Sequence, residues 1–402
     1  MNRYLAISTD NHAGLPPAQY RDYLDPQYRE KFDEALPIQI ARTTEASKFM
    51  LVEEINEEWR RGHEKGLTGA WDFDERLKVL DGDCTAAEVI FPDGITEMNS
   101  PPFAAGIGLS PKGADAELQW AGARSHNRWL AEFCQMAPER CHGVAVVPAT
   151  WDVKVAVDEV KWARKNGLGS IMVPVVWGDH DPYHHPKYDP LWAICQEYDM
   201  VVNFHAGAAD SEQYFGRNWP PEPGTEPLVG GMGIYICEAV WVAARPLTFL
   251  IWGGVFERFP RLKVAVIEAT ATWVPSYLEH WDERYSDWQV CAKLGDYKGH
   301  LSMKPSDYFR RNVRLGSFLS RREIERRYEI GVECLTWASD YPHPEGLWPE
   351  TVERTVEALN GIPEQEIAAV LGETAADFYG FDKEKLAPHV ERIGFEKSMF
   401  QA

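Results

Sequence analysis

Residues 144–174, VAVVPATWDVKVAVDEVKWARKNGLGSIMVP, decide the fold. Two short apolar runs, Val144–Val147 and Ser170–Val173, flank a stretch with helical periodicity, Asp152–Lys165. Apolar runs without polar alternation are typical of strands that are buried on both faces, as in parallel sheets covered by helices. The stretch therefore predicts a strand, a helix and a second strand parallel to the first.

The same alternation continues along the chain and predicts a closed barrel. Six further apolar runs predict strands: Leu5–Thr9, Ala87–Phe91, Met200–Phe204, Val264–Ile267, Val313–Ser317 and Leu335–Ser339. Eight such units favour a (β/α)8 TIM barrel over an open doubly wound sheet. No glycine-rich phosphate loop follows the first run, which argues against a nucleotide-binding Rossmann fold.

Composition narrows the classes of function. The 402 residues are 45% hydrophobic, which excludes wholesale disorder, and they carry 41 Lys and Arg against 62 Asp and Glu, a net charge of −21. So acidic a chain is a poor partner for nucleic acid or an anionic membrane surface. The seven cysteines form no CxxC pair, which is typical of reduced thiols. With no signal peptide or membrane-spanning run, we expect a cytoplasmic protein.

We expect one barrel domain over residues 1–402, with two additions. Residues 16–74 form a long charged segment after the first strand, which we predict to be an insertion that partly covers the barrel mouth as a lid. Residues 382–402 are expected to be a C-terminal extension. Aromatic residues in the insertion and loops could wall an apolar pocket, although core packing explains them equally well: Trp59, Trp71, Trp177 and Trp219.

The predicted strands end in side chains that bind metals or transfer protons. The first ends in Asp10-Asn11-His12, and three others end in His205, Glu268 and Asp340. In a barrel, the carboxyl ends of all strands meet at one mouth. Each residue alone could be a turn, core or capping residue, but together two imidazoles and two carboxylates can hold Zn²⁺ or Mn²⁺ and leave a position open.

Four segments of the chain resemble a known family. They lead into or form the predicted third, fifth, sixth and eighth strands: 136–148, 188–205, 253–264 and 337–343, which reads WASDYPH. The sequence is similar to the amidohydrolase-related decarboxylases and hydrolases typified by 2-amino-3-carboxymuconate-6-semialdehyde decarboxylase. The resemblance covers about residues 75–380, with the first-strand motif before it.

The resemblance implies a (β/α)8 barrel that binds one divalent metal ion per chain, most often zinc, with manganese or another ion as the alternative. The ligands that it implies are Asp10, His12, His205 and Asp340. It also implies a homodimer. Many members have His-x-His on the first strand, whereas this chain has Asp10-x-His12, which favours harder ions.

A second departure concerns the sixth strand, where Glu268 stands in place of the family's acid/base histidine. A carboxylate repels an anionic substrate, whereas a histidinium attracts one. Glu268 could act as a base with a raised pKa or as a further metal ligand, and either role fits hydrolysis more readily than decarboxylation. An arginine could supply the missing positive charge: Arg42, Arg76 or Arg124.

Other residues are weaker candidates for the site. His343 lies three residues after Asp340 and could donate a proton. His185, with His180 and His184, lies in the loop after the fourth strand together with Trp177, and we name His185, Trp177 and Arg124 as candidate substrate-binding residues.

The sequence therefore predicts a metal-dependent hydrolase. It would use a metal-activated water on a small amide, ester, lactone or activated C–C substrate that is cyclic or aromatic. Asp340 would accept the proton from that water, with help from Glu268 or His343. The alternative is a non-oxidative decarboxylase of an aromatic or unsaturated carboxylic acid. A barrel that has lost activity and serves as a binding protein is a third hypothesis, against which the intact ligand set argues.

Overall fold

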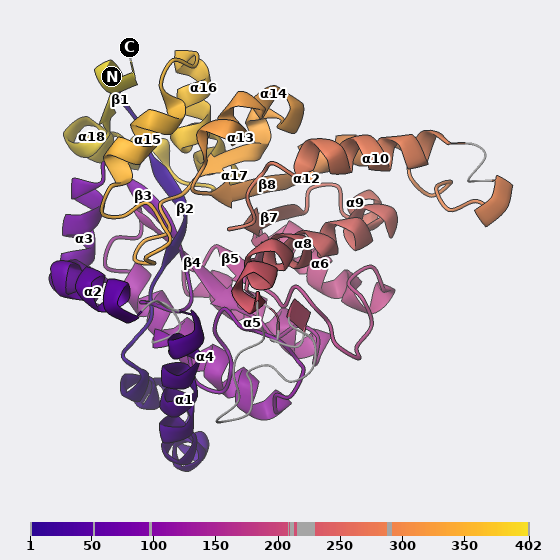
Figure 1. Cartoon of the computed structure of the whole chain (residues 1–402). Coiled ribbons are helices and arrows are strands. Elements are labelled where there is room, and N and C mark those ends of the chain that lie inside the picture. Colours follow the sequence, from indigo (N-terminus) through magenta and orange to yellow (C-terminus); the bar gives the residue numbers. More distant parts are fainter. Residues whose placement is uncertain are drawn as a thin grey trace.

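Eight parallel strands form the centre of the molecule (Figure 1). The computed structural model describes residues 2–50, 53–95, 99–207, 209, 213–214, 230–287 and 292–400. The strands pair in sequence order from first to last: β2 (Ile7–His12), β3 (Ala87–Phe91), β4 (Cys141–Val146), β5 (Ser170–Met172), β6 (Val201–His205), β7 (Lys263–Ile267), β8 (Val313–Ser317) and β9 (Leu335–Trp337). This arrangement confirms the predicted (β/α)8 barrel.

The last strand returns to the first, and two backbone hydrogen bonds join them. The amide of Asp340 donates to the carbonyl of Asp10 at 2.8 Å, and the amide of His12 donates to the carbonyl of Tyr341 at 2.7 Å. The barrel therefore closes between the two segments that carry Asp10, His12 and Asp340.

The first strand differs from its prediction in extent. It was expected to stop at Thr9, but β2 continues through Asp10 and Asn11 to His12. Its pairing with β3 shifts register between Ser8 and Asn11, which marks a β-bulge. A bulge redirects the side chains that follow it, so the predicted ligands lie within an irregular strand and not after a regular one.

Helix α5 (Val153–Lys165) shows how the predicted strand–helix–strand unit forms. The side chain of Asp152 caps it by accepting from the amides of Lys154 and Val155 at 2.8 and 3.1 Å. Ala156, Val160 and Ala163 follow at intervals of four and three residues and are completely buried.

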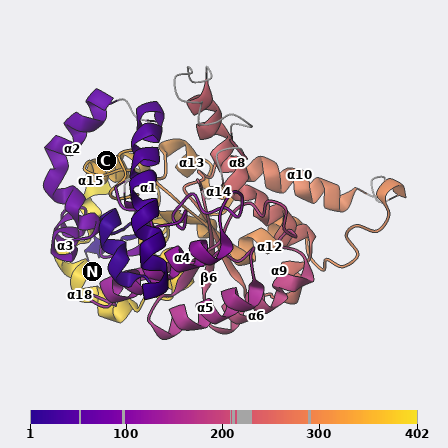
Figure 2. The ribbon, with the colours of Figure 1, turned by 90° about the horizontal axis from the view of Figure 1, so that it is seen from below.

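Other helices cover the outside of the barrel or extend from it (Figures 1 and 2). Their bounds are α3 (Phe73–Gly82), α4 (Ala116–Cys134), η5 (Pro186–Tyr188), α6 (Asp189–Glu197), α8 (Gly231–Trp252), α9 (Val255–Arg258), α10 (Val274–Ser286), α12 (Pro305–Asn312), α13 (Arg321–Glu325), α14 (Arg327–Ile330), η6 (Val332–Cys334), α15 (Thr351–Leu359), α16 (Glu364–Ala368), the π-helical turn η7 (Ala369–Glu373) and α17 (Thr374–Tyr379). In both views α10 projects away from the barrel.

The segment 16–74 is helical and contacts the loop after β9. It contains η1 (Pro17–Tyr23), η2 (Pro26–Tyr28), α1 (Arg29–Met50), α2 (Glu53–Leu67) and η3 (Thr68–Ala70). The rings of Trp59 and His63 pack against Trp348 with centroids 5.7 and 5.1 Å apart, and the hydroxyl of Tyr341 donates to the carbonyl of Gly66. Trp348 and Tyr341 follow β9, so α2 stands on the side of the strands' carboxyl ends. Its action as a lid stays a prediction.

The described part of the segment 382–402, residues 382–400, packs at the opposite end of the barrel. It forms α18 (Lys383–Ile393), β10 (Phe395–Glu396) and η8 (Lys397–Phe400). Strand β10 pairs antiparallel with β1 (Arg3–Tyr4), which directly precedes the first barrel strand. An ion pair of 2.7 Å between Arg3 and Glu396 reinforces the ribbon. The two chain ends thus lie together, away from the predicted ligands.

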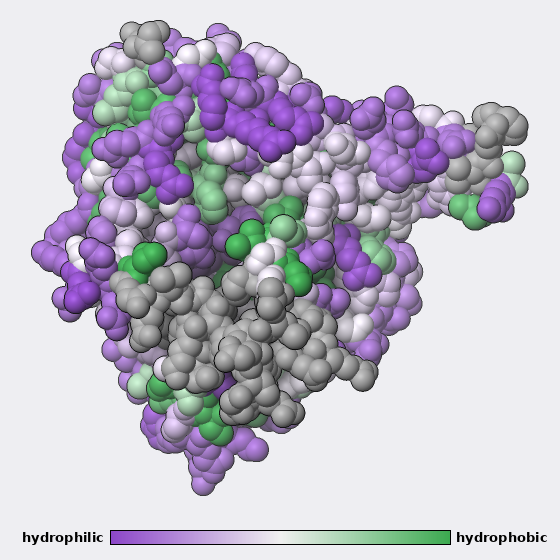
Figure 3. All heavy atoms as spheres, viewed as in Figure 1, coloured by the Kyte–Doolittle hydropathy of each residue, from purple (hydrophilic) through white to green (hydrophobic). Residues whose placement is uncertain are grey.

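Helix α8 is the one described helix that is long and apolar enough to cross a bilayer, judged by length and composition. Its stretch Gly233–Trp252 qualifies, and 44% of its most apolar window is buried within the protein. Ile234 and Ile236 near its start are exposed, and hydrophobic residues gather on that face (Figure 3). Core helices of soluble proteins have the same composition, so the expected absence of a membrane span stays a prediction.

The buried carboxyl group of Asp83, at the end of α3, makes stability depend on pH. The hydroxyl of Thr351 donates to this carboxyl at 2.7 Å, and burial raises its pKa to about 7, from 3.8 in an exposed aspartate. Folding therefore favours the protonated form, and this stability is lost as the pH rises towards 7. Between pH 5 and 8 the loss should be roughly 2–3 kcal/mol.

We predict that Asp83→Asn removes this loss. Urea unfolding at pH 5, 6.5 and 8 measures it, with Asp22→Asn at an exposed site as the control. An Asp83→Asn variant whose stability follows the wild-type pH curve would contradict the prediction.

Candidate metal centre

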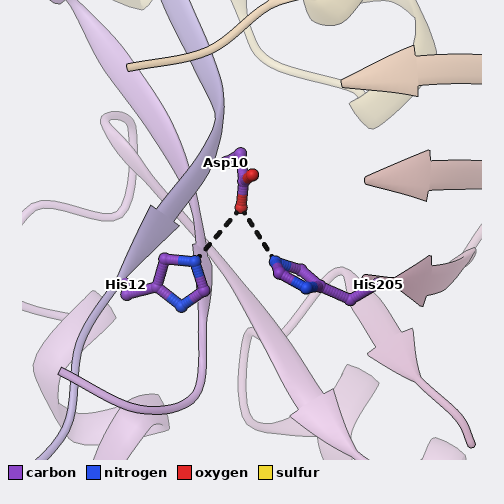
Figure 4. A group of neighbouring side chains, drawn as sticks. All are labelled: Asp10, His12 and His205. Carbon is purple, nitrogen blue, oxygen red and sulfur yellow. Dashed lines mark hydrogen bonds and ion pairs between the residues drawn. The ribbon is translucent and has the colours of Figure 1, made fainter. Parts of the chain in front are cut away.

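Three predicted ligands meet at the carboxyl ends of β2 and β6. Figure 4 shows the carboxylate of Asp10 pointing between the imidazoles of His12 and His205. Asp10 Oδ1 lies 3.3 Å from His12 Nε2 and 3.1 Å from His205 Nε2. All three side chains are buried, so water does not separate their charges.

Asp340 and His343 complete the cluster from the loop after β9. Asp340 Oδ1 lies 3.2 Å from His12 Nε2 and 3.2 Å from His343 Nδ1. The rings of His12 and His343 stack with their centroids 3.8 Å apart. The structure thus brings together all four predicted ligands and one predicted acid/base residue.

The outer nitrogens of both ligand histidines face backbone carbonyls. His12 Nδ1 lies 2.8 Å from the carbonyl oxygen of Pro92, and His205 Nδ1 lies 2.6 Å from that of Ala206. A carbonyl only accepts, so each Nδ1 carries the proton, and in a neutral ring each Nε2 then carries a lone pair. Holding Nδ1 in this way is how proteins orient histidine ligands.

The inner atoms need a cation. In the neutral form of both rings, the lone pairs of the Nε2 atoms face carboxylate oxygens, which also carry lone pairs, so a proton or a metal ion must lie between them. Asp10 Oδ2, His12 Nε2 and both oxygens of Asp340 are buried without a hydrogen-bond partner. Burial lowers the pKa of His12, but Asp10 and Asp340 outweigh it and hold that pKa well above its usual range. A metal ion satisfies these atoms together, so the residues fit one.

Glu268 follows β7 and faces the same cluster. Its Oε2 lies 3.7 Å from His205 Nδ1, and its side chain is 21% exposed. Burial raises the pKa of Glu268 well above its usual range, and the charges of Asp340 and Asp10 add to that shift. Its position at the barrel mouth matches the prediction, while its role as ligand, base or structural residue stays open.

Two of these carboxylates occupy strained backbone positions. Glu268 has φ of 57° and Asp340 has φ of 59°, in the left-handed region that non-glycine residues avoid. Each such residue costs of order 1–3 kcal/mol and persists only where the surrounding structure enforces it. The surrounding structure therefore fixes the backbone at both carboxylates of the cluster.

Three predicted substrate-binding residues lie elsewhere. Arg124 on α4 pairs with Glu159 of α5 at 3.2 Å, in a hollow between the two outer helices. His185 is exposed, and its Nδ1 accepts from the amide of Lys187. Trp177 is buried against Phe249, with ring centroids 4.5 Å apart. None of the three contacts the metal cluster in the described part of the chain.

The remaining predicted residues also lie apart from the cluster or outside the description. Arg42 is exposed on α1, and Arg76 is completely buried and engaged by Glu88. Trp219 lies outside the described residues.

A buried network behind the ligands was not predicted. Arg76 on α3 donates to both oxygens of Glu88 at 2.6 and 2.7 Å and to the carbonyl of His12 at 2.9 Å. Asn11 donates to Glu88 at 2.6 Å and accepts from the amide of Tyr341 at 3.1 Å. The available signal was Glu88 itself, because a charge inside the apolar run Ala87–Phe91 can be buried only with a partner.

Comparisons with known proteins agree with this geometry. The amidohydrolase family Amidohydro_2 matches residues 70–381. The gamma-resorcylate decarboxylase of Rhodococcus jostii (strain RHA1) is 25% identical over 234 residues, which cover 55% of this chain and 66% of that protein, just under two thirds of its length.

Solved structures share the fold. An amidohydrolase from Mycobacterium avium subsp. paratuberculosis K-10 is 20% identical, with a TM-score of 0.68 over 94% of this chain and 99% of that one. A dihydroxybenzoic acid decarboxylase from Polaromonas sp. JS666, with bound manganese and 2-nitroresorcinol, is 17% identical, with a TM-score of 0.59 over 94% and 97%.

A parallel eight-stranded barrel with imidazoles and carboxylates converging at the carboxyl ends of its strands defines a metal-dependent barrel enzyme. The family match covers most of the chain, so the chain belongs to the amidohydrolase family. The predicted resemblance is confirmed.

We predict that Arg76→Met destabilises the protein by about 3–5 kcal/mol, because Glu88 would stay buried without its cation. The double variant Arg76→Met/Glu88→Gln should recover most of the loss. Urea unfolding followed by tryptophan fluorescence measures both. The control is Arg21→Met, which breaks an exposed ion pair with Asp33 and should cost less than about 1 kcal/mol. Equal losses in Arg76→Met and Arg21→Met would show that the network contributes little.

Loss of a residue that only supports a metal ligand weakens metal binding by roughly 10–100-fold. We predict that His205→Ala, which removes a candidate ligand itself, weakens metal binding by more than that. Elemental analysis after equilibration with Mn²⁺ or Zn²⁺ measures bound metal. His185→Ala, in an exposed loop, is the matched control. Undiminished metal in His205→Ala would refute the ligand assignment.

Proposed function

We propose that this protein is a metal-dependent non-oxidative decarboxylase of an aromatic carboxylic acid. The observation that carries the proposal is the arrangement of His343 beside the ligand cluster. Its Nδ1 lies at ion-pair distance, 3.2 Å, from Asp340 Oδ1, its ring stacks on His12, and its Nε2 has no hydrogen-bond partner among the described residues. An oriented imidazole with one free nitrogen is suited to proton transfer.

Asp10, His12, His205 and Asp340 would hold one divalent ion. Bound there, the ion polarises a substrate oxygen as a Lewis acid. Two nitrogen and two carboxylate ligands accept either zinc, which the sequence predicted, or manganese, which is bound in the Polaromonas decarboxylase. The identity of the ion stays a prediction.

His343 would deliver the proton that decarboxylation requires. The bond between the ring carbon and the carboxylate breaks, CO₂ leaves, and the proton from His343 Nε2 takes its place on that carbon. Asp340 would orient the ring of His343 throughout. The gamma-resorcylate decarboxylase relative supports this reaction over others, since its name describes the same chemistry.

Hydrolysis of a small amide, ester or lactone is the second candidate. It is favoured by Glu268, because a carboxylate in place of the family's histidine is better suited to accept a proton from water than to attract an anion. In that reaction Glu268 would act as the base and Asp340 would assist it.

Assaying CO₂ release from a panel of hydroxybenzoates by the metal-loaded protein tests the proposal. We predict that His343→Asn, which keeps a donor towards Asp340, lowers the rate by roughly 10²–10⁴ while metal content and folding are kept. Glu268→Gln is the matched comparison, because a loss of that size there, with His343→Asn unaffected, would assign the proton transfer to Glu268. Absence of CO₂ release together with turnover of esters, amides or lactones would overturn the decarboxylase assignment.

Three further expectations stay predictions. They are a homodimer, a cytoplasmic location and a lid formed by residues 16–74. The contacts of α2 with the loop after β9 support the lid, because that loop carries Asp340 and His343.

A further inference from the structure

We propose that Phe91 is a positioning residue for the metal centre. It would fix the angle between the imidazoles of His12 and His205 and close the side of the centre that faces the barrel interior. Phe91 is the last residue of β3 and is completely buried. The inference rests on the metal centre of the proposed function and adds to it a residue that contributes no ligand atom.

The ring of Phe91 packs against both ligand rings. Its centroid lies 4.9 Å from that of His205, with the two ring planes at 58°, and 6.1 Å from that of His12, at 43°. The two imidazoles lie 5.2 Å apart and nearly perpendicular to each other, at 81°. The three rings therefore form a triangle, and a rotation of either imidazole changes its contact with Phe91.

The strand order shows that Phe91 reaches across the barrel. His12 and Phe91 are register partners on the neighbouring strands β2 and β3. His205 ends β6, which the strands β4 and β5 separate from β3. Contact with His205 therefore requires the side chain of Phe91 to extend over the barrel interior.

Apolar side chains fill the interior beside Phe91. It belongs to a completely buried group of residues that neighbouring strands contribute: Val89, Val146, Met172 and Ile267. By contrast, Glu268 and His343 at the mouth are partly exposed, with side-chain exposures of 21% and 10%. A further ligand of the ion, such as a substrate oxygen, would therefore approach from the mouth, where these two residues stand.

Phe91 completes the support that hydrogen bonds give the ligand rings. Each imidazole faces a carbonyl with its Nδ1, that of Pro92 for His12 and that of Ala206 for His205. One hydrogen bond fixes the direction of Nδ1 but allows the ring to tilt about it. Contact with Phe91 opposes that tilt and so fixes the direction in which Nε2 points. Residues that orient metal ligands in this way typically contribute roughly 10–100-fold in metal affinity.

Titrating the metal-free full-length protein with Co²⁺ tests this role without reference to activity. Phe91→Leu should weaken Co²⁺ binding by roughly 10–100-fold, and it should change the visible absorption spectrum of the bound ion, which reports coordination number and geometry. Val89→Ala is the matched control, because it removes apolar volume from the same buried group two residues earlier on β3. It should keep the affinity and the spectrum of the wild type, although it also creates a cavity.

The outcomes separate this role from the metal centre itself. Wild-type affinity and spectrum in Phe91→Leu would refute the role of Phe91 and leave the centre in place. Equal losses in Val89→Ala would also refute it, because they would come from general loosening of the interior. Absence of Co²⁺ binding in the wild type would overturn the centre and this role together. If Phe91→Leu does not fold, Phe91→Met, which fills more of the volume without a ring, is expected to show the same losses.

Discussion

The ion pair between Arg76 and Glu88 is the interaction on which the position of the metal ligands depends. Both side chains are completely buried. The guanidinium also donates, through Nη1, to the carbonyls of His12 and Gly69. A buried pair of this kind contributes little net stability compared with apolar residues, but breaking it is costly. Its effect here is geometric, because it fixes helix α3, strand β3 and the end of β2 to one another.

Asn11 extends that constraint across the closure of the barrel. It donates to Glu88 on one side and accepts from the hydroxyl of Ser339 and the amide of Tyr341 on the other. In the sequence, Asp340 lies between Ser339 and Tyr341, and Asn11 lies between Asp10 and His12. Asn11 thus joins the part of β2 that carries Asp10 and His12 to the segment that carries Asp340. The hydroxyls of Ser8 and Thr9 also make hydrogen bonds across this closure, beside the two backbone hydrogen bonds.

The barrel and the convergence of its candidate ligands could be predicted because they depend on local pattern. Apolar runs mark strands, and in a parallel barrel every strand delivers its last side chain to the same end, so Asp10, His12, His205, Glu268 and Asp340 could be grouped from chain position alone. The positions of the candidate substrate-binding residues could not be predicted in this way. Whether Arg124 points to the mouth or to Glu159 depends on the rotation of α4 against α5, which the sequence pattern does not specify. The hydrogen-bond network around Arg76 and the position of Glu345 near Asp340 could not be predicted either. Both depend on contacts between segments that lie far apart in the sequence or on the strained turn at Asp340.

Electrostatics and folding are coupled at this end of the barrel. Asp10, Asp340 and Glu268 are forced together by strand closure, and at Asp340 and Glu268 the backbone is held in a strained conformation as well. Like charges in a region shielded from water repel one another, and His12 and His343, each 3.2 Å from Asp340 Oδ1, offset part of that repulsion. Any cation that binds the folded chain but not the unfolded one therefore stabilises the protein in proportion to the logarithm of its concentration. A bound cation would relieve the repulsion that remains, so the carboxylates that cost the metal-free fold stability would be the same groups that favour cation binding.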